Sequence, residues 1–302
     1  MATQPTRPYY APPELLPGPL PTVAEILASK DRLSDFYQVR VVRVNEHYAV
    51  KFGHRASFQE GENMLFVQQS TSVPVPKVYA LFQAPVEGYK PDPTFIVMEY
   101  IPGSPLHKAW PTVTKPERRG IASQLRRHMN ELRSIPSPGY YGGIWRQPVL
   151  DKFFQDYLDP WDRYCRGPEI SGPHETEEQF VDAMWRCFDK VARYGDDRPG
   201  VRDRYSAWVR RQYHGAFKGH RSVFTHGDFF QANVMLRPDG SVVIMDWEHA
   251  GWYPSFSEYC NASMLLSHTG DWDDLLYDIL DEHFEAEMGW FHYSYSTIQY
   301  QP

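Results

Sequence analysis

The sequence predicts an α+β protein of two lobes, in which a small antiparallel β-sheet with one helix precedes a mainly helical part. Strand-like and helix-like patterns follow one another in the order β, β, α, β, β up to residue 101, and long helical patterns dominate after Pro105. The chain has 302 residues, of which 42% are hydrophobic and 15% aromatic, so it can bury a core in each lobe. We expect an N-terminal arm (residues 1–21), an N-lobe (22–101) and a C-lobe (102–302).

The expected arm contains seven prolines and no periodic apolar pattern, which favours an extended segment. Thr22 and Glu25 have the spacing of a capping box and predict a helix over residues 23–29. Two runs rich in β-branched residues, 39–44 and 48–52, flank Asn45, Glu46 and His47 and predict a β-hairpin. A helix over residues 58–69 and strands over 75–83 and 94–101 complete the N-lobe.

The C-lobe is expected to be mainly helical. Amphipathic or apolar patterns predict helices over residues 115–134, 150–164, 176–194, 202–215 and 273–288. The exception is the segment 224–247, where two apolar runs flank a turn at Pro238, Asp239 and Gly240. This segment predicts a β-hairpin within the helical lobe.

The charge distribution argues against nucleic-acid partners. The net charge is -7, no Lys or Arg follows Arg237, and residues 239–287 supply twelve carboxylates. Such a field repels phosphate backbones and attracts cations, which favours an amine-bearing substrate or a metal ion. A well-solvated helical surface would give the same composition, and the sequence leaves both readings open.

Cysteine usage and hydropathy indicate a compartment. The three cysteines lie far apart with no Cys-x-x-Cys spacing, so neither a disulfide framework nor a zinc site is indicated. No stretch approaches the roughly 20 apolar residues that span a bilayer, and the N-terminal residues lack a charged-then-apolar leader. We therefore expect a soluble, cytoplasmic protein without a membrane partner.

The strongest chemical signal is a pair of motifs in the segment 225–248. Asp228 and Asn233 lie five residues apart in a loop, and a hairpin then ends at Asp246. Phosphoryl transfer needs such a set, because one carboxylate orients or deprotonates the acceptor hydroxyl while an amide oxygen and a second carboxylate hold Mg²⁺. The alternative is that Asp228 and Asn233 cap turns and Asp246 ends a strand.

These residues resemble a known family. His-Gly-Asp-x-x-x-x-Asn at residues 226–233 and Ile-x-Asp-Trp-Glu at 244–248 are similar to motifs of the aminoglycoside phosphotransferase and choline kinase family, and residues 20–27 and 62–67 resemble its fungal members. The resemblance extends from Leu33 to about Ser263. It implies a protein-kinase-like fold that uses ATP or GTP with Mg²⁺. It also implies that Asp228 is the catalytic residue and that Asn233 and Asp246 are metal ligands.

The resemblance assigns nucleotide contacts in the N-lobe as well. Lys51 would grip the α- and β-phosphates and pair with a helix carboxylate, for which Glu60 is favoured and Glu62 held in reserve. For Lys51 the alternative is an exposed strand lysine. Adenine would bind to a hinge formed by Met98, Glu99, Tyr100 and Ile101. We place the nucleotide loop at residues 44–47, which contain no glycine to bring backbone N–H groups close to phosphates.

Acidic and aromatic residues near the second motif are candidates for substrate recognition. Carboxylates that can bind an amine or a polyol are Glu248, Glu258, Asp271, Asp273 and Asp274. Glu248 can instead join the metal shell or form a surface ion pair. Trp252 is a candidate for stacking on a substrate cation, with core packing as the alternative.

The function that these patterns predict is an ATP- and Mg²⁺-dependent kinase for a hydroxyl of a small, cationic or polyol metabolite, with the nucleotide between the lobes. The alternative is a kinase-like protein that binds or transforms a metabolite in the same cleft without ATP. The glycine-free loop and the pair Phe229 and Phe230 motivate that alternative. A protein substrate is disfavoured, because no activation segment separates Asp246 from the following helices.

Overall fold

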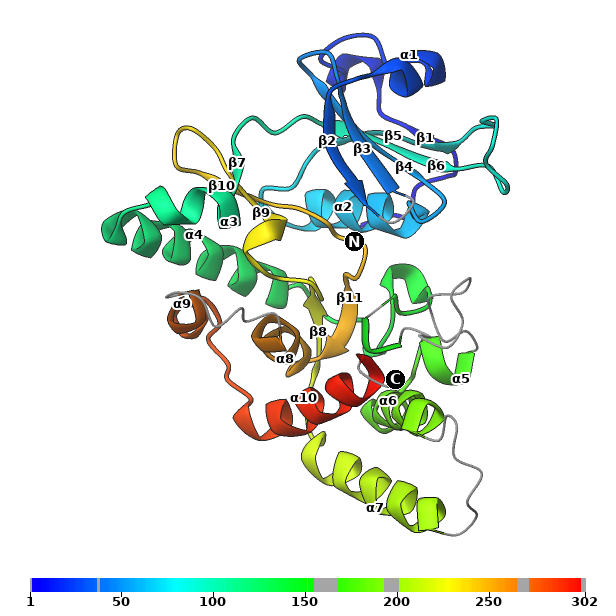
Figure 1. The fold of residues 1–302 in the computed structure, drawn as a ribbon, viewed down its shortest axis with the longest axis vertical. Helices are drawn as coiled ribbons and strands as arrows, with labels where there is room; N and C mark the ends of the chain where they lie inside the picture. Colours follow the sequence, from blue (N-terminus) through cyan, green and yellow to red (C-terminus); the bar gives the residue numbers. More distant parts are fainter. Residues whose placement is uncertain are drawn as a thin grey trace. The chain divides into compact units, whose positions relative to one another are not determined.

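The computed structural model describes residues 2–36, 39–150, 152–154, 168–192, 201–264 and 272–299. The chain forms two compact units, each described here by itself (Figure 1). Unit 1 contains Met1–Gln124 and Gln231–Glu248, and unit 2 contains Leu125–Phe230 and His249–Pro302. This division differs from the predicted boundary after residue 101, because the hairpin that carries Asp246 packs with the N-terminal residues.

A six-stranded antiparallel sheet dominates unit 1. Its strand order is β1-β5-β6-β4-β3-β2. The strands are β1 (Tyr9–Tyr10), β2 (Arg32–Phe36), β3 (Val39–Val44), β4 (Tyr48–Gly53), β5 (Val78–Gln83) and β6 (Thr94–Glu99). Helix α2 (Phe58–Ser70) packs against β5 and β6 (Figure 1). The approach is close, since a Cβ on Gly61 would lie 2.8 Å from Leu81 Cδ1.

Packing in the sheet core fixes the register of the central strands. Every residue of β4 is buried, and it lies between β3 and β6. The Phe95 ring stacks on Phe52 at 5.3 Å and on Phe82 at 5.2 Å between ring centroids. These contacts cross three adjacent strands, so alternate apolar side chains on β4, β5 and β6 fix the register.

Several local predictions for the N-terminal part are confirmed. Helix α1 (Val23–Ala28) begins at a capping box, in which Glu25 N–H donates to Thr22 Oγ1 at 3.2 Å and Thr22 N–H to Glu25 Oε2 at 2.7 Å. The predicted hairpin is β3–β4, whose turn begins at Asn45 with φ 57°. His47 N–H donates to Asn45 Oδ1 at 2.8 Å and closes the turn.

Two strands of the sheet were not predicted. Strand β2 pairs with β3 and adds a second hairpin before the predicted one. Strand β1 belongs to the arm and pairs with β5, with Tyr9 opposite Leu81. The arm is therefore part of the sheet for two residues, and a short 3₁₀ turn (Pro13–Leu15) follows it.

The rest of unit 1 is built on the predicted hairpin of the second motif. Strand β9 (Val234–Leu236) pairs with β10 (Val242–Ile244) and with the short β7 (Ser104–Pro105). Gly103 has φ 142°, and a Cβ there would lie 2.2 Å from the Leu236 carbonyl oxygen, so the chain crosses the hairpin where a side chain has no room. Helix α3 (Leu106–Ala109) and the first part of α4 (Lys115–Arg133) complete the unit, with 3₁₀ turns at Trp110–Thr112 and Gln231–Asn233.

Unit 2 is mainly helical within its described residues. It contains the end of α4, the helices α5 (Pro168–Ser171), α6 (Glu177–Ala192), α7 (Val201–Ala216), α8 (Ser257–Met264), α9 (Trp272–Ile279) and α10 (Glu285–Gln299), and a two-stranded sheet of β8 (Ser222–Thr225) and β11 (Gly251–Pro254). Short 3₁₀ turns lie at Ile144–Arg146 and Lys152–Phe154. The α+β prediction is confirmed, and none of the helices in the described ranges has the length and apolar character needed to cross a membrane.

Two helix predictions in unit 2 need comment. The helix expected over residues 273–288 is wrong, because the chain leaves the helical conformation between α9 and α10. The residues of this break, Asp281 and Glu282, pair with side chains of α4 instead. The helix expected over 150–164 lies mostly outside the described residues, and the described part is the turn Lys152–Phe154.

Candidate active site

A buried lysine surrounded by carboxylates is the centre of the site in unit 1. Lys51 lies on β4 with 8% of its surface exposed. Its Nζ is 2.7 Å from Glu60 Oε2, 2.9 Å from Asp246 Oδ1 and 4.0 Å from Glu248 Oε2. The predicted pair of Lys51 with Glu60 is confirmed, and the alternative of an exposed strand lysine is wrong.

The sequence of α2 explains why Glu60 is the partner. Ser57 is the N-cap residue, and its hydroxyl accepts from Gln59 N–H at 2.9 Å. This start places Glu60 in the first turn, on the side facing β4. Glu62, the reserve candidate, is bound instead by Arg7, whose Nε lies 2.6 Å from Glu62 Oε1.

The electrostatics of the cluster are dominated by burial and by mutual attraction. Burial raises the pKa of Glu60 to about 8, although the nearby Lys51 ammonium opposes this shift. Burial lowers the pKa of Lys51, but Asp246, Glu60 and Glu248 outweigh it and hold the pKa well above its usual value. The ammonium therefore stays charged, and the carboxylates around it share one cation.

Asn233 and Asp246 lie at the same end of the β9–β10 hairpin. Ile244 pairs with Val234, and one step further Met245 N–H donates to the Asn233 carbonyl at 2.8 Å. Asp246 follows directly with φ 59°, a left-handed conformation that turns the chain out of the strand. The predicted metal ligands are thus neighbours across the hairpin, brought together by its register.

The segment after Asp246 is tied to α2. Trp247 is fully buried, and its indole N–H donates to the Ile244 carbonyl at 3.0 Å. The Asn63 side chain donates to the Trp247 carbonyl at 2.7 Å. Helix α2 therefore holds Lys51 through Glu60 and the Asp246 segment through Asn63.

The oxygen donors of this cluster suit Mg²⁺. Glu60, Asp246 and Glu248 each offer a carboxylate oxygen, and these oxygens lie within 4.8 Å of one another. The Asp246 side chain is 36% exposed, so it can accept a further ligand. Carboxylate and amide oxygens are the groups that Mg²⁺ prefers, and Asn233, whose carbonyl accepts from Met245 N–H, has an amide side chain.

The predicted hinge begins within β6, which ends at Glu99, and continues to Ile101. The side chains of Met98 and Ile101 are buried. Two backbone N–H groups of the segment are already bonded, since Glu99 N–H donates to Lys77 O and Tyr100 N–H to His47 O, both at 2.8 Å. These two amides hold the hinge to the sheet and are not available to adenine in this conformation.

The predicted nucleotide loop at residues 44–47 forms the turn of the β3–β4 hairpin. This turn lies beside the hinge, because the Tyr100 N–H donates to the His47 carbonyl. Along β4 it is about 13 Å from Lys51, at roughly 3.3 Å per residue. The assignment of this turn to the phosphates stays a prediction.

The loop that carries Asp228 belongs to unit 2 and is held from beneath by a carboxylate. Glu258 of α8 is 1% exposed and accepts from His226 N–H at 2.6 Å and from Gly227 N–H at 3.2 Å. Asp228 N–H donates to His226 Nδ1 at 3.2 Å. Gly227 has φ 82°, and a Cβ there would lie 2.7 Å from the His249 carbonyl. The loop therefore has no room for a side chain at Gly227, and it needs the Glu258 carboxylate to accept its two N–H groups.

Three predicted substrate contacts need correction or qualification. Glu258 is buried under the loop and binds backbone, so it is a positioning residue rather than a substrate contact. Trp252 is 3% exposed on β11 and packs edge to face against Phe224 at 5.4 Å, so the core alternative holds. Asp271 lies outside the described residues. Phe229 is also fully buried, against Trp272, which removes it from ligand contact.

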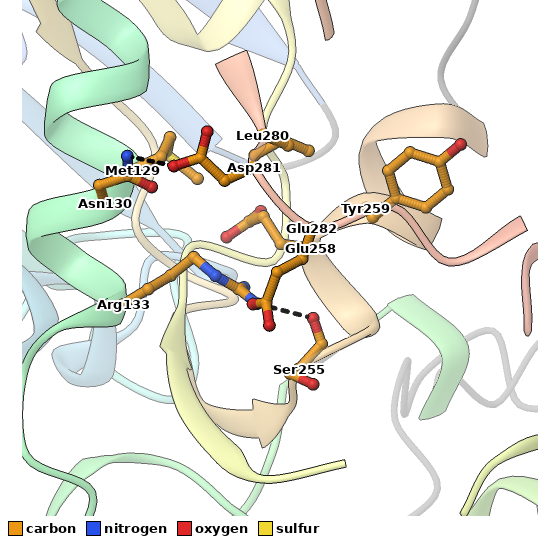
Figure 2. A pocket seen from close by; sticks show the side chains of 9 residues that line it. All are labelled: Met129, Asn130, Arg133, Ser255, Glu258, Tyr259, Leu280, Asp281 and Glu282. Carbon is orange, nitrogen blue, oxygen red and sulfur yellow. Dashed lines mark hydrogen bonds and ion pairs between the residues drawn. The ribbon is translucent and has the colours of Figure 1, made fainter. Parts of the chain in front are cut away.

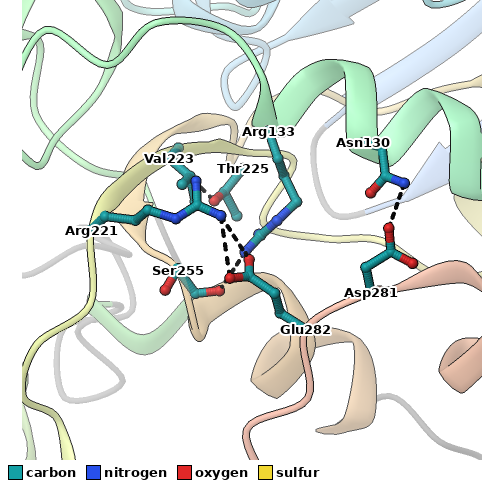
Figure 3. A network of polar contacts seen from close by, with 8 residues as sticks. All are labelled: Asn130, Arg133, Arg221, Val223, Thr225, Ser255, Asp281 and Glu282. Atoms are coloured by element: carbon teal, nitrogen blue, oxygen red, sulfur yellow. Dashed lines mark hydrogen bonds and ion pairs between the residues drawn. The ribbon is translucent and has the colours of Figure 1, made fainter.

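A polar network lies at the end of α4, beside a small cavity that Glu258 also lines (Figure 2). Arg133 donates to the Ser255 carbonyl at 3.0 Å and pairs with Glu282, which also binds Arg221 (Figure 3). Burial raises the pKa of Glu258 to about 7, while the backbone N–H of His226 and the Arg133 charge oppose the rise. The network was not predicted, because the break that carries Glu282 reads as continuous helix in the sequence.

The chain was compared with known proteins. Residues 28–292 match the model of a family described as the phosphotransferase enzyme family, APH. No curated protein sequence matches. Among solved structures, an apo thermostable mutant of aminoglycoside phosphotransferase APH(4)-Ia is similar, with TM-score 0.59 and 13% identity over 89% of this chain and 84% of that one. The streptomycin–ATP ternary complex of APH(2")-IIa has TM-score 0.55 and 14% identity over 90% and 86% of the two chains. These likenesses show a kinase-like fold.

Proposed function

Because this chain belongs to the phosphotransferase enzyme family, we propose that it transfers the γ-phosphate of ATP to a hydroxyl of a small cationic or polyol metabolite. The observation that carries the proposal is the meeting of Lys51 with Glu60 and Asp246 in unit 1. A buried ammonium held by two carboxylates is a preformed site for an anionic ligand, because phosphate oxygens can replace one of the carboxylates.

The nucleotide would be held by groups of unit 1. Lys51 would bind the α- and β-phosphates while Glu60 keeps its ammonium in place, and the hinge at 99–101 would face the base. Similar structures contain ADP with hygromycin B or GDP with kanamycin at 14% and 12% identity, so either purine nucleotide is compatible with the fold. We favour ATP and treat GTP as the alternative donor.

Asn233 and Asp246 would hold the metal ion that accompanies the nucleotide. When bound, Mg²⁺ neutralises charge on the phosphate oxygens. The left-handed turn at Asp246 keeps its carboxylate directed away from the β10 ladder, and Asn63 fixes the chain after it through the Trp247 carbonyl. These contacts support Asp246 as one of the two donors.

Asp228 would accept the proton of the attacking hydroxyl. The acceptor oxygen forms a bond to the γ-phosphorus, the bond from that phosphorus to the bridging oxygen breaks, and the proton passes to the Asp228 carboxylate. Glu258 fixes the loop by accepting two of its backbone N–H groups, so the carboxylate of Asp228 is oriented before substrate arrives.

The class of the acceptor follows from charge. Residues 239–287 contain twelve carboxylates and no Lys or Arg, a composition that attracts cations. Glu248, 19% exposed and 4.0 Å from Lys51 Nζ, is the described carboxylate that we assign to the acceptor beside the phosphates. Similar enzymes have been solved with hygromycin B, streptomycin or kanamycin, and at 12–14% identity those names indicate amine- and hydroxyl-bearing ligands only as a class to screen.

The reaction would take place in a reducing compartment. Cys187 and Cys260 are buried, and neither forms a disulfide within the described part of the chain, which supports a cytoplasmic location. The alternative of a non-phosphorylating, ATP-independent protein loses one of its two motives, because Phe229 lies in the core and not at a ligand site.

An acceptor screen tests the proposal. Purified protein, ATP and Mg²⁺ are incubated with panels of aminoglycosides, amino alcohols and polyols, and ADP release is measured with mass detection of a phosphorylated product. Asp228→Asn should abolish product formation. Asp239→Asn is the matched control, because Asp239 binds Ser241 in the exposed turn between β9 and β10. Absence of product from every panel, in protein that binds ATP, would count against the proposed acceptor class.

A further inference from the structure

The N-terminal arm contacts the helix that carries Glu60. Arg7 donates from Nε to Glu62 Oε1 at 2.6 Å and from a terminal nitrogen to Glu62 Oε2 at 2.8 Å. Its guanidinium also lies 4.7 Å from the ring centroid of Phe58, the first residue of α2. A bidentate arginine–carboxylate pair fixes both distance and orientation.

The pair matters because Glu62 is buried. The Glu62 side chain has no exposed surface, whereas Arg7 keeps 43% of its side chain exposed. A buried carboxylate that loses its cation raises the free energy of the folded state, and this increase is smaller if the helix moves so that water can reach the carboxylate. The position of α2 is thus coupled to the presence of Arg7.

Glu62 and Glu60 lie on different sides of α2. Residues two apart are separated by about 200° around a helix of 3.6 residues per turn. Glu60 is directed to Lys51, and Glu62 is directed to the arm. The helix is therefore held from both sides, by the lysine of β4 and by the arginine of the arm.

The arm itself is anchored where α2 rests on the sheet. Tyr9 pairs with Leu81 of β5, and Ala11 N–H donates to the Tyr79 carbonyl at 2.8 Å. Leu81 is also the residue against which Gly61 of α2 packs. At the far end of the helix, Thr3 N–H donates to the Gln69 side chain at 3.0 Å. The strand pairing gives Arg7 a fixed base from which to hold Glu62.

We propose that Arg7 is a positioning residue of the nucleotide site, and that it acts by holding α2 where Glu60 meets Lys51. The inference rests on the proposed function for its kinetic consequence, but its structural consequence is independent of any substrate. Without Arg7 the helix shifts to solvate Glu62, the Glu60–Lys51 pair loosens, and the ammonium is no longer fixed for the phosphates.

Hydrogen exchange of the α2 amides in nucleotide-free protein, together with ATP kinetics, tests this inference. Arg7→Ala should raise exchange of the α2 amides by about tenfold and lower kcat/KM for ATP by about tenfold, with the KM of the acceptor unchanged. Arg7→Lys keeps the charge but not the bidentate geometry. Its exchange rates and its kcat/KM for ATP should lie between those of Arg7→Ala and the wild type. In the double variant Arg7→Ala/Glu62→Gln the α2 amides should recover most of their protection from exchange, because the buried charge that Arg7 balanced is also removed.

Arg32→Ala is the matched control, since Arg32 forms an exposed pair with Asp35 on an edge strand of the same unit. It should change neither exchange of α2 nor the KM of ATP. Unchanged exchange and unchanged ATP kinetics in Arg7→Ala would overturn the inference. If Arg7→Ala does not fold, Arg7→Lys and the double variant decide in the same way. If the wild type transfers no phosphate but exchange of the α2 amides rises in Arg7→Ala, the proposed function is refuted and the positioning role of Arg7 remains.

Discussion

Lys51 in unit 1 and Glu258 in unit 2 are both buried charged residues, but they have partners of different kinds. Lys51 meets side-chain carboxylates from α2 and from the segment after β10. Glu258 meets backbone N–H groups of the loop at His226 and Gly227. Side-chain partners can give way to a ligand, whereas backbone partners hold the chain in one conformation. The first arrangement is suited to binding, and the second to fixing a catalytic loop.

Exposure of the partners supports this difference. The Asp246 side chain is 36% exposed and that of Glu248 19%, so ligand atoms can reach the carboxylates around Lys51. Glu258 is 1% exposed, and Arg133 behind it is 12% exposed. Substitutions in the first cluster should therefore affect activity most, and substitutions in the second should affect both stability and activity.

The largest effect is expected for Lys51→Met. Removing the ammonium should lower kcat/KM for ATP by about 10³-fold, because the phosphates lose their fixed cation. The free energy of unfolding should change little below pH 8. Burial raises the pKa of Glu60 to about 8, so this carboxyl can take up a proton and leaves no unpaired charge when the lysine is removed. Kinetics and thermal unfolding of the same preparation measure both quantities. A variant with normal ATP kinetics would remove Lys51 from the site.

Glu258→Gln should produce the next largest effect. The amide offers one acceptor oxygen where the carboxylate offers two, so one of the two loop N–H groups loses its partner. We expect kcat to fall by about 10- to 100-fold and the free energy of unfolding by about 2 kcal/mol, with the KM of ATP unchanged. Glu178→Gln, an exposed change in the first turn of α6, is the control and should alter neither.

The contribution of the polar network at the end of α4 to stability can be measured by comparing two arginines of this helix. Arg133 binds Ser255 and Glu282 with 12% of its side chain exposed, whereas Arg126 pairs with Asp281 with 53% exposed. Arg133→Ala should cost about 2 kcal/mol of unfolding free energy and Arg126→Ala less than about 0.5 kcal/mol. Denaturant unfolding measures the two values, and equal losses would mean that burial of the network does not matter.

The smallest effect is a pH dependence at His220. Burial lowers the pKa of His220, but hydrogen bonds and charges from Glu177 and Glu287 on its two ring nitrogens outweigh this and raise the pKa above 6.5. The folded state therefore holds the proton more tightly than the unfolded state. The stability that this gives is complete below pH 6.5 and is lost as the pH rises through the raised pKa.

Thermal unfolding from pH 5.5 to 8.5 measures this dependence. The wild type should lose stability toward the alkaline end, and His220→Gln should show a flatter profile above pH 6.5. His107→Gln, an exposed change in α3, should retain the wild-type slope. A wild-type profile that rises with pH in this window would contradict the assignment to His220.

Regular periodicity and motif spacing were enough to predict most of unit 1. The β3–β4 hairpin and α2 follow from local patterns that are read over a few residues, whereas the pair of Lys51 with Glu60 was predicted from the family resemblance. The proximity of Asn233 and Asp246 follows from hairpin register. These features depend on short sequence separations.

Features that depend on distant partners were not predictable. Strand β2, with Arg32, Ser34 and Asp35 among its five residues, has no apolar alternation and exists because β3 offers it an edge. Glu258 was taken for a substrate ligand, because nothing in the sequence shows that the loop 226–227 lies over its carboxylate.

Calorimetric titration with ATP, in the presence and absence of Mg²⁺, is the most direct test of the central claim that the Lys51–Asp246 cluster is a nucleotide site. The wild type should bind ATP with an affinity that increases with Mg²⁺, and Asp246→Ala should lose the Mg²⁺-dependent part while remaining folded by circular dichroism. GTP is titrated in parallel. Well-folded wild type that binds neither nucleotide, or an Asp246→Ala variant that binds Mg²⁺ and ATP as the wild type does, would contradict the account.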